Sequence, residues 1–221
     1  MRSDNGVIGE TGLKFFGKIS ASISHEIRNA LAIINESAGL LKDFATLGDG
    51  ERSRDPERIA SLARQVMRQI RRADGIIDNM NAFAHSVDES IKQVDLKETV
   101  KLMSALCQRF ATLRMVKLAV EDDGGSAVVF TNPFLLENLI WLCLDFAMQA
   151  VGEGKTVLLT TEGAEKNVRL KFGKLEGLDS VLSDSFPGPR EKALLEALAV
   201  DMTVDVGAGE LVIVLSREER A

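Results

Sequence analysis

Two long stretches of regularly spaced apolar residues constrain this chain more than any other feature. Between Leu13 and Leu41 the apolar positions recur every three or four residues, and the same spacing returns between Ile59 and Val87. This period is typical of amphipathic helices that pack against other helices. The segment Leu47–Gly50 contains two glycines and an aspartate and predicts a turn, after which Asp55 and Pro56 predict a helix start. The sequence therefore predicts a hairpin of two long helices.

One hairpin can bury only part of two such stripes. Two hairpins paired as a four-helix bundle would bury the rest, so we expect a homodimer. After Gln93 the pattern changes to shorter helices mixed with strands. That part of the chain predicts a two-layer α/β sandwich. We therefore expect an α+β protein with a dimerisation hairpin over residues 1–92 and an α/β domain over residues 93–221.

Composition excludes several functions. The formal net charge of −6 makes a general nucleic-acid binder unexpected. No apolar run reaches the ~20 residues of a membrane-spanning helix, and we expect a cytoplasmic protein. With two histidines and two cysteines, none at metal-ligand spacing, the sequence predicts no metal held by this chain.

His25 is the candidate reactive residue of the first helix. It lies two residues from both Ile23 and Ile27. At about 100° per residue the imidazole is thus expected on the solvent side, opposite the apolar stripe. A neutral imidazole can attack an electrophilic phosphorus. The Glu26 carboxylate could hold the proton of the other ring nitrogen, and the Asn29 amide, one turn later, could position a water molecule for hydrolysis of an acyl phosphate on a partner.

The segment FFGKISASISHEIRNALAIINESAGLL resembles the phosphoacceptor motif of sensor histidine kinases. The resemblance implies that His25 accepts the phosphoryl group, that Glu26 is the acid/base and that Asn29 acts in dephosphorylating a receiver domain. Ala30 stands where the family usually has proline, which removes a helix kink without touching the chemistry.

The later segment TNPFLLENLIWLCLDFAMQAVGEGKTVLLTTEGAEKNVRLKF resembles the ATPase domain of the same family in its hydrophobic spacing. In that register the asparagine that coordinates nucleotide-bound magnesium falls on Phe146, and the asparagine four residues earlier falls on Leu142. Phenylalanine offers no oxygen to a cation that requires oxygen ligands. The adenine-reading Asp-x-Gly-x-Gly motif and the glycine-rich lid are also missing between Lys171 and Gly188. The resemblance thus implies a degenerate ATPase-like domain with no cofactor of its own.

The sequence hypothesis is a histidine phosphotransfer protein that exchanges phosphoryl groups between His25 and receiver aspartates without ATP. Magnesium would be supplied by the receiver, and autokinase activity is predicted to be absent. Three alternatives remain open: a receiver phosphatase, a non-catalytic dimeric regulator that binds receivers, and an ATP-using kinase with an aberrant site. Two lesser features are His85, near the domain junction, and a row of arginines on the second helix that could meet an acidic receiver: Arg54, Arg58, Arg64, Arg68, Arg71 and Arg72.

Overall fold

A computed structural model describes residues 4–46, 55–122, 124–152, 155–181 and 186–217. Its contacts divide the chain into two compact units. The hairpin unit is Ser20–Ala82, and the α/β unit combines Met1–Ile19 with Phe83–Ala221. This division differs from the boundary expected between residues 92 and 93, because the start of the first helix packs with the second part of the chain.

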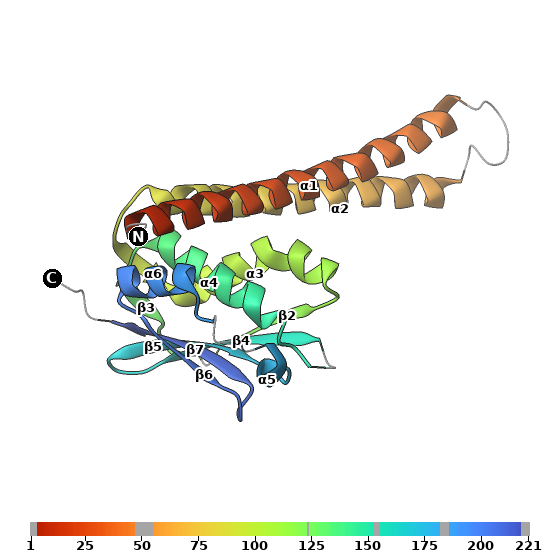
Figure 1. Ribbon diagram of the computed structural model, residues 1–221. Coiled ribbons are helices and arrows are strands. Elements are labelled where there is room, and N and C mark those ends of the chain that lie inside the picture. The colour runs from red at the N-terminus through yellow and green to blue at the C-terminus, as the bar shows by residue number, and fades with distance from the viewer. Residues whose placement is uncertain (1–3, 47–54, 123, 153–154, 182–185, 218–221) are drawn as a thin grey trace. The chain divides into compact units, whose positions relative to one another are not determined.

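The hairpin unit is made from two long helices, which Figure 1 shows running side by side. Helix α1 is Asp4–Thr46 and helix α2 is Pro56–Ala84. The Asp55 carboxylate accepts the backbone N–H of Glu57 at 3.0 Å, so the expected helix start is confirmed. The turn expected at Leu47–Gly50 lies outside the described residues. The α1–α2 pairing confirms the hairpin.

Side chains within the hairpin unit follow the expected stripes only in part. Ile23 and Ala30 of α1 are buried between the helices. A second set of apolar side chains stays 39–50% exposed in the single chain: Leu31, Leu40, Ile59, Met67, Ile70, Ile77 and Met80. Such a long exposed apolar row is unusual for a helix that packs on one neighbour alone.

The α/β unit contains a five-stranded sheet in the order β2-β4-β5-β7-β6, and a separate two-stranded sheet of β1 and β3. Strands β2 and β4 are parallel, and the other neighbours in the large sheet are antiparallel. The elements in chain order are β1 Lys92–Asp95, α3 Leu96–Leu113, β2 Lys117–Asp122, β3 Val128–Thr131, α4 Pro133–Ala147, β4 Thr156–Gly163, β5 Asn167–Gly173, α5 Leu178–Val181, α6 Pro189–Leu198, β6 Asp201–Asp205 and β7 Glu210–Ser216.

Helices α3, α4 and α6 cover one face of the large sheet (Figure 1). Alternate residues of the central strands point into this layer, among them Leu159, Leu170 and Ile213, all fully buried. Helix α4 is apolar on nearly every side and lies at the centre of the unit. Asn132 caps it by accepting the backbone N–H of Leu135 at 2.9 Å. The expected two-layer α/β sandwich is therefore confirmed.

An aromatic cluster attaches the start of α1 to the α/β unit. Phe15 meets Phe83 edge-on at a centroid distance of 5.3 Å and lies 5.6 Å from Phe134 at the start of α4. Phe15 and Phe83 are almost completely buried. Aromatic burial of this size dominates local packing, which explains why residues 1–19 belong with the α/β unit.

Candidate phosphotransfer site

His25 lies on α1 in the hairpin unit, and its side chain is exposed. Ile23 is 5% exposed and Ile27 is half-buried, so the two neighbours of the imidazole in the apolar stripe point inward. The helical period thus places the ring in solvent, as the spacing predicted. An imidazole in this position is accessible to a macromolecular partner.

Asn29 lies one turn after His25 and contacts its ring. The Asn29 Nδ2 atom is 3.1 Å from His25 Nδ1. This contact leaves Nε2 as the ring nitrogen that faces away from the helix neighbour. If the amide presents Nδ2, it donates to Nδ1 and the ring proton lies on Nε2. If the amide is turned, Oδ1 accepts the Nδ1 proton and Nε2 carries the free lone pair.

Glu26 contacts the second helix. Arg72 Nη2 lies 3.4 Å from Glu26 Oε2, and the two side chains are 48% and 22% exposed. The contact places Arg72 of α2 level with the turn of α1 that carries Glu26 and His25. Among the described residues, Glu26 contacts Arg72, whereas the His25 imidazole contacts Asn29. The sequence interpretation assigned the ring-orienting role to Glu26 and did not identify the Asn29 contact, although the four-residue spacing would have indicated it.

Exposed arginines continue along α2 beside this group. Arg64, Arg68 and Arg71 are exposed, while Arg54 falls outside the described residues. Arg58 lies over the Phe44 ring at 4.8 Å, near the far end of the hairpin. The side of α2 that carries Arg72 therefore presents positive charge next to the Glu26–Arg72 contact.

The two positions at which the sequence predicts lost nucleotide-site asparagines both hold buried apolar side chains. Leu142 and Phe146 lie on α4 and are 7% and 8% exposed. Phe146 stacks on Phe186, with ring centroids 3.7 Å apart and planes 5° apart. Phe186 comes from the segment before α6, where the sequence pattern indicates no functional residue. Its only signal in the sequence is a lone aromatic side chain in this segment.

The described residues contain no group of three or more histidine, cysteine, aspartate or glutamate side chains that could hold a metal ion. Cys107 and Cys143 are buried free thiols, and burial raises the pKa of each. His85 is exposed and its Nδ1 lies 2.7 Å from Asp88 Oδ2. None of these residues adds a ligand or a nucleophile to the His25 group. Among the described helices none is both long and apolar enough to cross a bilayer.

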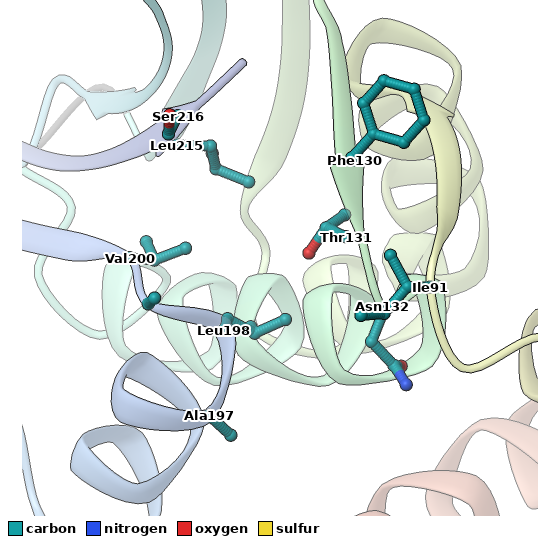
Figure 2. A pocket seen from close by; sticks show the side chains of 10 residues that line it. Ile91, Phe130, Thr131, Asn132, Ala197, Leu198, Val200, Leu215 and Ser216 are labelled. Atoms are coloured by element: carbon teal, nitrogen blue, oxygen red, sulfur yellow. The ribbon is translucent and has the colours of Figure 1, made fainter. Parts of the chain in front are cut away.

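A hollow of about 150 Å³ lies elsewhere in the α/β unit, between β3, β7 and the end of α6. Figure 2 shows Leu198, Val200, Leu215 and Thr131 around it. Among its described lining residues there is no ionisable side chain. The hollow offers no group for proton or phosphoryl transfer, so it is not a second candidate for the chemistry.

Comparison with known proteins agrees with the hairpin geometry. Residues 17–88 match the His Kinase A (phospho-acceptor) domain. The match covers the helical hairpin, so this part of the chain is similar to the phospho-acceptor domain of histidine kinases. Among curated relatives, the sensor protein kinase PilS of Pseudomonas aeruginosa is 26% identical over 212 residues, which cover 91% of this chain and 36% of that protein. Sporulation kinase B of Bacillus subtilis is 23% identical over 141 residues, covering 64% of this chain and 31% of that protein.

The chain therefore spans about a third of the length of these relatives. Among solved structures, the Acinetobacter baumannii histidine kinase AdeS aligns at 17% identity and a TM-score of 0.47, covering 88% of this chain and 98% of that one. Histidine kinase ThkA, solved with the response regulator TrrA, aligns at 16% identity and a TM-score of 0.41, covering 93% of this chain and 63% of that one.

Proposed function

We propose that this chain is a histidine phosphotransfer protein that exchanges phosphoryl groups between His25 and receiver-domain aspartates without using ATP. The observation that carries the proposal is a contrast between the two units. The phosphoacceptor imidazole is exposed and has an amide partner, whereas the position expected to bind nucleotide magnesium holds Phe146, stacked on Phe186.

Phosphoryl transfer from a receiver to His25 requires no nucleotide, because the receiver's aspartyl phosphate supplies the phosphoryl group. His25 Nε2 attacks the phosphorus of a receiver's aspartyl phosphate, an N–P bond forms, and the P–O bond to the acyl oxygen breaks with its electron pair returning to the carboxylate. For this step the Asn29 amide is turned so that its Oδ1 accepts the Nδ1 proton. The imidazole keeps that proton, and the acceptor stabilises the positive charge of the phosphorylated ring. Magnesium on the receiver would neutralise charge on the phosphoryl oxygens.

The partners in this proposal are a second copy of the chain and response-regulator receivers. The exposed apolar row of the hairpin unit would be covered in a four-helix bundle of two hairpins. The exposed arginines of α2 would attract an acidic receiver surface. Neither interaction requires nucleic acid, a membrane or a cofactor held by this chain.

The test incubates the chain separately with labelled phosphorylated receiver and with labelled ATP. We expect label on the chain from the receiver only, and its loss in the variant His25→Gln. The variant His85→Gln is a matched control, because His85 is the other histidine and is also exposed. Label from ATP alone would contradict the proposal, and equal labelling of His25→Gln would exclude His25 as the acceptor.

A second function, hydrolysis of receiver phosphate, is favoured by the exposure of Asn29 beside His25. In this reaction the amide orients a water molecule toward the acyl phosphate. Accelerated loss of receiver phosphate in the His25→Gln variant, abolished by Asn29→Leu, would identify a phosphatase. A chain that binds receivers but gives neither transfer nor hydrolysis would be a non-catalytic regulator.

A further inference from the structure

Strand β2 forms one edge of the five-stranded sheet, because within the described residues β4 is its only neighbour. The backbone N–H of Lys117 donates to Lys155 O at 2.8 Å, which places the backbone groups of Lys117 on the β4 side. Backbone groups of successive residues point to opposite sides of a strand, so those of Leu118 and Val120 point away from the sheet. This edge therefore offers two N–H groups and two C=O groups to an added strand.

The side chains along this edge are also unusually open. Val120 is 37% exposed, although its register partner on β4, Leu159, is completely buried. Lys117 and Glu121 are exposed and lie on the other face of the strand. Neither forms a salt bridge with another described residue. An edge strand that leaves apolar and unpaired charged side chains open is suited to pair with another strand.

The residue order of β2 makes the strand complementary to itself. If two copies pair antiparallel about Ala119, Lys117 lies opposite Glu121 of the second copy, and Leu118 lies opposite Val120 of the second copy. The two-fold axis repeats both contacts. Leu118 and Val120 then exchange their outward hydrogen bonds. Lys117 and Glu121 occupy non-hydrogen-bonded positions, where facing side chains approach more closely and opposite charges stabilise the pair.

The other edge of the sheet lacks this complementarity. Strand β6 has an exposed aspartate at each end, Asp201 and Asp205. Antiparallel pairing of two β6 strands about Thr203 would set Asp201 opposite Asp205, and like charges in facing positions destabilise a strand pair. Pairing of β2 with β6 of a second copy would set Glu121 against Asp201 whenever Lys117 meets Asp205. The charges therefore favour pairing of β2 with β2.

We propose that β2 is an interaction surface for a second copy of this chain, which adds its own β2 in antiparallel register about Ala119. The two five-stranded sheets then join into one continuous sheet. Leu118 and Val120 meet on the face covered by helices (Figure 1), whereas the Lys117–Glu121 ion pairs lie on the open face. This surface belongs to the α/β unit and is distinct from the exposed apolar row of the hairpin unit, so the proposal does not rest on phosphotransfer.

Disulfide trapping in the full chain tests the pairing. In the proposed register the two Ala119 residues face each other with Cα atoms about 4.5 Å apart, a separation that a disulfide spans. Ala119→Cys should therefore form a covalent dimer on oxidation with copper–phenanthroline, detected on a non-reducing gel. Thr203→Cys, exposed in the middle of β6, is the matched control and should cross-link at least about tenfold more slowly, because no strand pairing brings its thiols together. The unsubstituted chain measures the contribution of the buried native thiols, Cys107 and Cys143.

Charge reversal separates strand pairing from random collision. In the Ala119→Cys chain, Lys117→Glu or Glu121→Lys should slow cross-linking at least about tenfold, because each sets like charges opposite at both ends of the paired strands. Both substitutions in one chain, or a mixture of the two variants, recreate opposite charges and should restore cross-linking. Rescue in the mixture shows that the single variants are folded. Cross-linking of Ala119→Cys no faster than that of Thr203→Cys, or a rate unaffected by charge reversal, would overturn the proposal.

Discussion

Phe146 lies flat against Phe186, with the two ring centroids 3.7 Å apart and the planes within 5° of parallel. Phe146 belongs to α4 and Phe186 to the segment before α6, so the stack joins the central helix of the α/β unit to that segment. The pair contributes both apolar burial and an aromatic interaction. The stack therefore supports the packing of α4 against the segment before α6.

Replacing Phe146 with alanine should destabilise the protein. Truncation of a buried phenylalanine typically lowers the free energy of unfolding by about 3–5 kcal/mol, and the open edge of this stack favours the lower end. Urea denaturation of Phe146→Ala measures the loss. Phe130→Ala is the control, because Phe130 is 41% exposed, and it should lower the free energy of unfolding by less than about 1 kcal/mol. Equal losses in the two variants would contradict a structural role for the stack.

Glu137, also on α4, predicts a pH-dependent stability. Burial raises the pKa of its carboxyl from 4.5 to about 7, against the opposite effects of Ser86 and Lys92. The folded state therefore holds the proton more tightly than the unfolded state. The free energy of unfolding should fall as the pH rises from 4.5 to about 7 and then level off, a total loss of about 3 kcal/mol from this group.

The measurement compares urea denaturation of wild type and Glu137→Gln between pH 4.5 and 8. Glutamine cannot ionise, so the free energy of unfolding of Glu137→Gln should increase relative to that of wild type as the pH rises. Glu121→Gln on β2 is the control, since Glu121 is exposed and should leave the pH dependence unchanged. A difference between wild type and Glu137→Gln that stays constant with pH would contradict the raised pKa.

The hairpin could be predicted from sequence because its pattern is local. The apolar period and the Asp55-Pro56 start follow from helix geometry alone, and both are confirmed by α2 and its cap. The solvent position of His25 follows from the same period. The strands of the central sheet were also predictable, since Val168, Leu170 and Phe172 alternate with exposed or half-buried residues.

Other features depend on contacts between distant residues, and the sequence did not predict them. Strand β1 exists only because Lys92–Asp95 pairs with β3, and its four residues carry no strand pattern of their own. The parallel pairing of β2 with β4 depends on α4 crossing between them. Phe186 and Arg72 acquire their partners from segments more than 35 residues away, which no local period encodes.

The Glu26–Arg72 contact should contribute little to stability. Its atoms are 3.4 Å apart, and both side chains are partly exposed to water. A double-mutant cycle with Glu26→Gln and Arg72→Gln should give a coupling energy below about 1 kcal/mol, reduced further in 0.5 M salt at roughly a 4 Å screening length. Arg68→Gln, an exposed arginine one turn away on α2, should give no coupling with Glu26→Gln. A coupling energy near 3 kcal/mol would identify a buried, structural ion pair instead.

Asn29 is predicted to control which ring nitrogen of His25 is nucleophilic. The variant Asn29→Asp presents only acceptor oxygens at the position 3.1 Å from Nδ1, so it should hold the ring proton on Nδ1 and keep Nε2 free. Asn29→Leu removes the contact. We expect phosphoryl transfer from a labelled receiver to stay within a few-fold of wild type in the aspartate variant. The leucine variant should lose about tenfold, the rate equivalent of one hydrogen bond.

Nitrogen-15 NMR of the two histidines provides a readout that is independent of the transfer rate. His85 has a carboxylate oxygen of Asp88 at 2.7 Å from its Nδ1 and serves as the internal reference for a ring whose Nδ1 carries the proton. The His25 signals should move toward this reference in Asn29→Asp and away from it in Asn29→Leu. If neither variant changes the His25 tautomer while both slow transfer equally, Asn29 acts on the receiver rather than on the ring, as a water-orienting amide would.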